Sequence, residues 1–211
     1  MHRTALIHQN SLYYTTVNTN MFEFFVILCV ISLAHGCSPI TEHDQTKYCR
    51  TQYAFTGTVI SNKENDIEAV FRIRVNSNIK ERLASPGQII TVYGRGTLNS
   101  CGPTRLDRNK EYILYVSIYD ASTGRPEINE FYEATATYVN RINNYDCSCE
   151  VEMNLPWQPS PDNTTPAKDK CVITRNEFDC SFEKGYCARR RNRYGLGPCR
   201  WIAPDIVCPQ N

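Results

Sequence analysis

Cys37 is the residue whose position suggests unusual chemistry. It directly follows a leader-like segment that ends in Ala34-His35-Gly36, with small residues at the two positions that a signal peptidase inspects. If the leader is removed after Gly36, the mature chain begins with this cysteine, and its α-amine and backbone carbonyl are both available as ligands. A disulfide through the same residue would pin these two groups to the body of the protein.

The leader indicates the compartment. Its apolar run, Met21–Leu33, is too short for a comfortable membrane span, so the sequence predicts a signal peptide within residues 1–36, with Met21 as the working start. The alternative is an N-terminal membrane anchor, but no stop-transfer pattern follows the run. We therefore expect a secreted protein in the extracellular space or matrix. Asn163-Thr-Thr in a Pro-rich stretch predicts N-glycosylation of Asn163 in an exposed loop.

The cysteine count also favours secretion. Of the 11 cysteines, Cys29 lies in the leader, which leaves an even number in the mature chain and predicts a disulfide framework in an oxidising compartment. Zinc binding is the competing interpretation, and it is weak because Cys147-x-Cys149 is the one tight pair and no C-x-x-C occurs. The mature cysteines are Cys37, Cys49, Cys101, Cys147, Cys149, Cys171, Cys180, Cys187, Cys199 and Cys208.

The residue inventory argues against an enzyme. Three of the four histidines lie in the leader, which leaves only His43 for acid–base or metal chemistry. The motifs G-x-S-x-G and H-E-x-x-H and the phosphate-binding loop do not occur in the sequence. A formal net charge of +1 does not favour a nucleic-acid partner. We predict a protein that is not an enzyme and has no cofactor of its own.

The region behind Cys37 has a β pattern that would hold it. In Glu68–Val75, for example, Phe71, Ile73 and Val75 share one face, and arginines occupy the other. Short strands separated by turn signals favour a small closed or nearly closed barrel. Strands are predicted at Gln52–Ile60, Glu68–Val75, Ile89–Tyr93 and Glu111–Tyr119, with a shorter fifth near Glu127–Ala136.

The period then changes. Apolar residues from Phe131 to Tyr145 fall at helical spacing, which predicts a helix that packs on the barrel and buries its aromatic stripe. Leu155–Pro166 is Pro-rich and predicts an extended linker or loop. The following piece, Cys171–Cys208, is too small to bury much core and must depend on disulfides.

The stretch Cys37–Cys49 resembles the opening of the tissue inhibitors of metalloproteinases, which are built on a netrin-like module. That opening has the form C-x-C-x-P-x-H-P-Q-x-x-F-C, and here the first and last cysteines, His43 and Gln45 stand in register, with Tyr48 as the aromatic. Further along, Asn99-Ser-Cys-Gly resembles the family's Ser-Val-Cys-Gly. The later matches are Cys147-x-Cys149 at the domain junction and Cys187 through Cys199-Arg-Trp201.

The resemblance implies a mainly β fold. Residues 37–147 would form a five-stranded, OB-fold-like netrin-like barrel with packed helices, and residues 148–211 a small disulfide-rich subdomain. By analogy with the family, the implied bonds are Cys37–Cys101, Cys49–Cys147, Cys149–Cys199 and Cys171–Cys187, with Cys180–Cys208 as the leftover pair.

One position departs from the family. The third mature residue is normally a cysteine, and here it is Pro39. The usual partner of that cysteine would fall near Tyr132–Tyr138, a stretch that contains no cysteine either. Both ends of one bridge are thus missing together. Proline stiffens the segment by fixing φ, but the lost bridge predicts weaker or more selective binding than in a fully bridged relative.

The function that the resemblance implies is inhibition of zinc metalloendopeptidases, such as matrix metalloproteinases. The α-amine and carbonyl of Cys37 would chelate the protease's catalytic zinc and displace its reactive water, and Ser38 would enter the S1′ pocket. The implied protease-binding edge consists of Cys37, Ser38, Pro39, Ile40, Asn99, Ser100 and Cys101.

A binding-only module is the alternative. Netrin-like modules also occur without any protease contact, so the chain would then be a non-inhibitory extracellular matrix protein. The arginines Arg189, Arg190, Arg191 and Arg193, with Arg200 nearby, would bind a sulfated glycosaminoglycan. A solvated basic loop between two cysteines explains the same residues.

Overall fold

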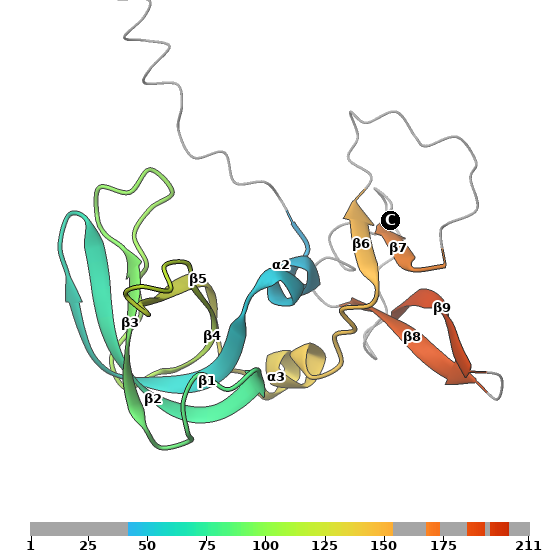
Figure 1. Ribbon diagram of the computed structural model, residues 1–211, viewed down its shortest axis with the longest axis horizontal. Coiled ribbons are helices and arrows are strands. Elements are labelled where there is room, and N and C mark those ends of the chain that lie inside the picture. Colours follow the sequence, from blue (N-terminus) through green and yellow to red (C-terminus); the bar gives the residue numbers. More distant parts are fainter. Residues whose placement is uncertain (1–41, 154–167, 174–184, 193–194, 203–211) are drawn as a thin grey trace, which may run out of the picture. The chain divides into compact units, whose positions relative to one another are not determined.

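The computed structural model describes residues 42–153, 168–173, 185–192 and 195–202, which belong to one compact unit, Ile40–Asn211. They form a mainly β structure with two helices and a disulfide-rich C-terminal region (Figure 1). The helices are α2 Asp44–Arg50 and α3 Ala136–Ile142, and the strands are β1 Tyr53–Glu64, β2 Glu68–Lys80, β3 Ile89–Arg95, β4 Glu111–Ile118, β5 Pro126–Glu133, β6 Glu150–Met153, β7 Lys170–Ile173, β8 Tyr186–Asn192 and β9 Gly195–Ile202.

Five strands close into a barrel, as predicted. Their order is β1-β2-β3-β5-β4, and β4 pairs with β1 to complete the ring. Strands β3 and β5 are parallel and join at a single residue pair, Tyr93 with Glu127. Arg125 reinforces this closure, because its guanidinium lies 3.7 Å from the centre of the Tyr93 ring and forms an ion pair with Glu68 on β2. Side chains therefore help to seal the barrel where the ladder is shortest.

The barrel interior follows the alternation in the sequence. Phe71, Ile73 and Val75 are at most 2% exposed, whereas Arg72 and Arg74 between them are exposed. Strands β1 and β2 both run beyond their predicted ends at Ile60 and Val75, to Glu64 and Lys80. The added residues are largely polar, so an apolar alternation does not mark them.

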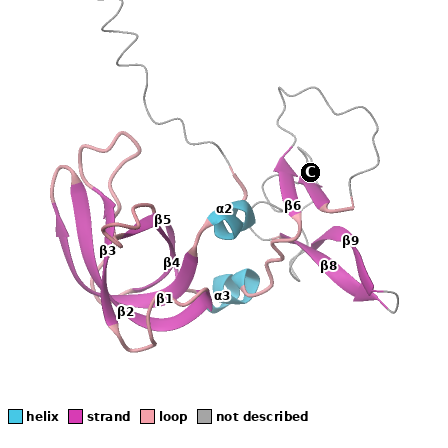
Figure 2. Ribbon diagram, in the orientation of Figure 1, coloured by secondary structure: helices cyan, strands magenta, loops and turns pink. Residues whose placement is uncertain are grey.

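Strand β4 is buried on both faces. Leu114 and its alternate neighbours point into the barrel, and Ile113 and Tyr115 point outward into a second apolar cluster. The second cluster includes Tyr48 of α2 and Ile142 of α3. Figure 2 shows both helices beside the barrel. Because both faces of β4 are buried, the sequence of this strand is a nearly continuous apolar run.

The predicted helix begins later than its spacing suggested. Phe131 and Tyr132 belong to β5, where they pair with Leu114 and Ile113 of β4. Strand alternation sends Phe131 to the barrel core and Tyr132 to the helix-side cluster. Helix α3 starts only after its N-cap Thr135, whose side chain accepts a hydrogen bond from the Tyr138 N–H. Pairing with β4 thus overrides the helical spacing at Phe131.

The C-terminal region contains strands that the sequence did not predict. Strands β6 and β7 are parallel, and β8 and β9 form an antiparallel pair. Their buried cluster consists of Cys149, Cys171, Cys187 and Cys199, with Trp201 and Val151 packed against it. Cystines therefore supply most of the apolar contact here, as expected for so small a piece.

Phe71→Ala should lower the free energy of unfolding by about 3–5 kcal/mol, because it leaves a cavity in the closed barrel. Denaturant unfolding of the oxidised protein measures the change. Arg72→Ala, one residue along the same strand, is the control and should change stability by no more than about 0.5 kcal/mol. Similar losses in both variants would contradict the assigned strand faces.

Candidate functional site

Part of the predicted edge lies in an exposed turn after β3. Asn99 holds this turn, since its Oδ1 accepts from the Cys101 N–H at 3.0 Å and its carbonyl accepts from the Gly102 N–H at 2.8 Å. Gly102 has φ of +79°, a value that favours glycine. Ser100 and Cys101 are exposed. The other predicted edge residues, Cys37, Ser38, Pro39 and Ile40, lie outside the described residues, as does the glycosylation residue Asn163.

This turn rests on the turn between β1 and β2. The N–H groups of Gly96, Thr97 and Leu98 donate to the carbonyls of Ile67, Asn65 and Asp66 at 3.0–3.1 Å. The contact is so close that a Cβ on Gly96 would lie 2.4 Å from backbone atoms of Ile67 and Glu68. We call the two joined segments, Asn65–Ile67 and Gly96–Cys101, the double-turn edge.

Two large apolar side chains project from the double-turn edge. Ile67 is 85% exposed and Leu98 is 78% exposed. Neither residue was predicted from the sequence, although an isoleucine directly after Asn65-Asp66 in a turn was an available signal. Their exposure on a hydrogen-bonded backbone makes the double-turn edge suitable for contact with another protein.

Helix α2 starts at Asp44, two residues after the first described residue. It was not predicted from the sequence. His43 caps the helix, because its Nδ1 accepts from the Gln45 N–H at 3.2 Å. At the other end, Lys80 of β2 donates to the carbonyls of Tyr48, Cys49 and Thr51 at 2.6–3.0 Å. Both ends of this seven-residue helix are therefore fixed by side chains.

Three consecutive polar residues at the start of α2 are buried: His43, Asp44 and Gln45 are 1%, 7% and 1% exposed. Burial of polar groups is costly unless each finds a partner. His43 packs edge-on against Trp201 of β9, with ring centres 5.1 Å apart. We call these three residues the anchor triad.

Asp44 is the centre of a hydrogen-bonded cluster. Its Oδ2 accepts from the hydroxyls of Tyr145 at 2.7 Å and Tyr115 at 3.1 Å, and it lies 3.4 Å from Nη2 of Arg141. Burial, and then the Asp44 carboxylate, raise the pKa of Tyr115 and Tyr138 well above the ordinary value. The tyrosines therefore stay protonated and can donate.

Gln45 joins α2 to the C-terminal region. Its amide pairs with the backbone of Cys187, accepting from the N–H at 2.7 Å and donating to the carbonyl at 2.8 Å. The same Nε2 also donates to the Asp146 carbonyl at 3.0 Å. A residue predicted only as part of a family opening thus bridges 142 positions of sequence.

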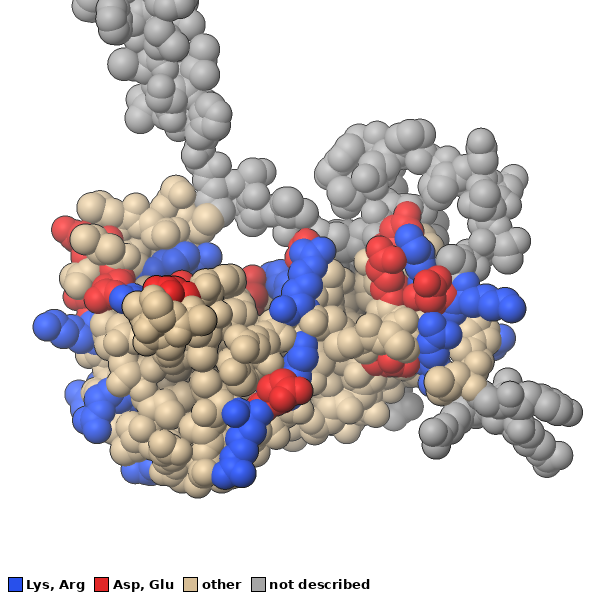
Figure 3. Space-filling view, viewed as in Figure 1, with Lys and Arg blue, Asp and Glu red and all other residues tan. Residues whose placement is uncertain are grey.

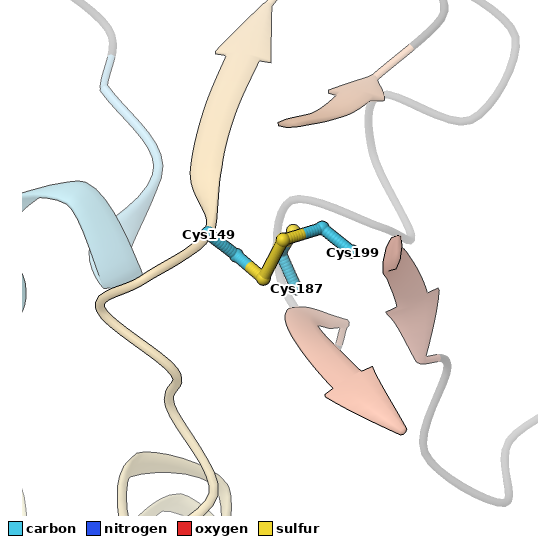
Figure 4. Close-up of side chains that lie close together, drawn as sticks. All are labelled: Cys149, Cys187 and Cys199. Carbon is cyan, nitrogen blue, oxygen red and sulfur yellow. A yellow bond between two sulfur atoms is a disulfide. The ribbon is translucent and has the colours of Figure 1, made fainter. Parts of the chain in front are cut away.

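Three sulfur atoms crowd together behind this contact. The Sγ atoms of Cys149, Cys187 and Cys199 lie within 4.8 Å of one another (Figure 4). Metal binding requires a thiolate, and each of these sulfurs is instead bonded to another sulfur. The cluster therefore consists of two adjacent cystines, Cys149–Cys199 and Cys171–Cys187.

The described residues contain three of the five implied disulfides. Cys101 is also disulfide-bonded, but its partner lies outside the described residues, so Cys37–Cys101 stays a prediction. Cys180 and Cys208 likewise lie outside them. The three bonds are Cys49–Cys147, Cys149–Cys199 and Cys171–Cys187.

The basic segment is only partly available for an anionic ligand. The Nε of Arg189 donates to the Ser148 hydroxyl at 3.0 Å, and the backbone N–H of Arg189 donates to Oδ2 of Asp146 at 3.1 Å. Arg190 is exposed, whereas the side chain of Arg191 and the whole of Arg193 lie outside the described residues. On the face shown in Figure 3, basic and acidic side chains lie close together near β6 and β7 of the C-terminal region.

The closed five-stranded barrel, with two helices on the outer face of β4 and a cystine-rich region after it, defines an OB-fold-like domain. Comparison with protein families narrows this class. Residues 46–144 match the UNC-6/NTR/C345C module, so this part of the chain is similar to a netrin-like module.

That family is not a known enzyme family, and its modules are typically extracellular. No curated protein matches the chain. Among the helices of the described residues, neither is long and apolar enough to cross a membrane.

Gln45→Ala should lower the free energy of unfolding by about 1–3 kcal/mol, because the buried N–H and carbonyl of Cys187 lose their partners. Limited proteolysis should also release fragments of the C-terminal region faster than in the unmodified protein. Gln88→Ala removes an exposed glutamine and is the matched control. Equal protease resistance in all three proteins would contradict the bridging role.

Proposed function

We propose that the mature protein inhibits zinc metalloendopeptidases through its N-terminus. The α-amine and carbonyl oxygen of Cys37 chelate the catalytic zinc of the protease, and Ser38 enters the S1′ pocket. The chelating amine must be deprotonated, which costs little near neutral pH because an α-amine has a pKa of roughly 7.7–8.0. The protein itself carries no cofactor in this mechanism.

The observation that carries the proposal is the double-turn edge. Cys101, the proposed partner of Cys37, sits in it and is disulfide-bonded. The backbone of the edge is held by hydrogen bonds from Gly96, Thr97 and Leu98 to the β1–β2 turn. A rigid support of this kind lowers the ordering cost of binding, since the chelating group is already oriented. The netrin-like module is consistent with this function.

The start of α2 supports the same proposal from the other side. His43, which caps the helix, follows Cys37 by only six positions, so the helix limits where the mature N-terminus can reach. Ile67 and Leu98 extend the contact surface beyond the residues next to the zinc. We assign them the role of an apolar rim that packs on the protease beside its cleft.

The mechanism requires a free α-amine at Cys37. Mature protein that begins at Cys37 should inhibit at least one member of a panel of zinc endopeptidases, and protein with one extra alanine ahead of Cys37 should not. A serine protease without zinc serves as the control enzyme. Equal behaviour of the two proteins would exclude chelation, and inactivity of both would favour the binding-only module.

The apolar rim provides a separate prediction. Leu98→Ser should weaken inhibition by about 5- to 30-fold, the loss expected if Leu98 is one of the few interface residues that contribute more than about 1 kcal/mol. Leu196→Ser is the control, because Leu196 is also highly exposed, at 69%, but lies in β9. Inhibition constants measured with the same protease decide the matter, and equal constants for both variants would remove Leu98 from the interface.

A further inference from the structure

The buried carboxylate of Asp44 binds Tyr115, Tyr145 and Arg141. We propose that Asp44 is a positioning residue. Its hydrogen bonds tie the first turn of α2 to β4 and to the region around α3, in place of the disulfide that is missing at Pro39. Because Asp44 follows Cys37 by only seven positions in the sequence, a fixed α2 should limit the freedom of the mature N-terminus. This inference rests on the function proposed above.

The partners of Asp44 come from distant parts of the chain. Tyr115 lies 71 positions away on β4, and Arg141 and Tyr145 lie 97 and 101 positions away, in and just after α3. These contacts link the start of α2 to β4 and to the region of α3. The side chains of Asp44 and Arg141 are only 8% and 10% exposed, so solvent screens their attraction little.

The location of the cluster matches that of the missing bridge. The absent cysteine partner would fall near Tyr132–Tyr138, between Tyr115 and the two later partners of Asp44, Arg141 and Tyr145. The Asp44 carboxylate acts electrostatically on Tyr132 and Tyr138, the two ends of that stretch. After burial, Asp44 is the next largest cause that raises the pKa of Tyr132 and of Tyr138. The cluster therefore joins the two regions that a covalent bond would join.

A buried carboxylate is destabilising unless it is paired, so Asp44 at this position needs its cluster to form. When the cluster forms, the first turn of α2 has one orientation. Asp44 follows Cys37 by seven positions, so freedom at the first turn reaches the mature N-terminus over a short length of chain. Loss of the cluster should therefore loosen α2 and shorten the lifetime of a complex made through Cys37.

The test compares mature proteins that begin at Cys37. Asp44→Asn removes the charge at nearly constant size. Ile73→Val is the matched control, because it lowers stability through the barrel core by about 0.5–1.5 kcal/mol without contact with α2. Two quantities are measured well below the unfolding temperature: amide hydrogen exchange in α2, and the dissociation rate of the complex with a zinc endopeptidase that the unmodified protein inhibits.

We expect Asp44→Asn to increase both the exchange rates in α2 and the dissociation rate by about tenfold, as loss of charged hydrogen bonds implies. Ile73→Val should leave both within about twofold. If Asp44→Asn does not fold, Tyr145→Phe removes only the hydroxyl that bonds Asp44 and should act in the same direction by about threefold.

The outcomes separate the two proposals. Faster exchange in α2 with unchanged dissociation overturns the positioning role and leaves inhibition intact. Equal effects of Asp44→Asn and Ile73→Val also overturn it, because general loss of stability would then explain the result. If the unmodified protein inhibits no zinc endopeptidase, the proposed function fails. Amide hydrogen exchange in Asp44→Asn then decides the positioning role of Asp44. Faster exchange confined to α2 and α3 supports this role, and uniform or absent acceleration overturns it.

Discussion

The burial of three consecutive polar side chains at the start of α2 is the constraint on which the rest of the structure depends. Each must find a partner inside the protein, and each finds it in a different place. His43 packs on β9, Asp44 binds tyrosines of β4 and the α3 region, and Gln45 pairs with β8. One short segment therefore fixes the helix layer to the barrel and the C-terminal strands to both.

The strands were predictable where burial produces a pattern. Phe71 and its neighbours alternate because one face of β2 is solvated, and β4 is a continuous apolar run because both of its faces are covered. Helix α2 was not predictable, because its inward residues are mainly polar and show no apolar period. Phe131 fell within both the predicted fifth strand and the predicted helix, since spacing alone cannot reveal that it pairs with Leu114.

The candidate site was predictable in a different way. Asn99, Ser100 and Cys101 were predicted through a resemblance that depends on a few cysteines. Ile67 joins them because the β1–β2 hairpin happens to place its turn against Gly96, and hairpin length is poorly marked in polar sequence. The partners of Asp44 lie 71 or more positions away, so only the folded chain brings them together.

The two turns of the double-turn edge are joined largely by backbone groups, and the side chains of Asn65, Thr97 and Asn99 add hydrogen bonds that hold them. The hydrogen bonds that join its two turns require an N–H at Gly96, Thr97 and Leu98 but little of the side chains at Ile67 and Leu98. The backbone form of the double-turn edge therefore depends little on which side chains stand at Ile67 and Leu98. The outward residues can change in evolution or by selection from a library while the support keeps its form, so this surface is a natural place for new binding specificity to arise.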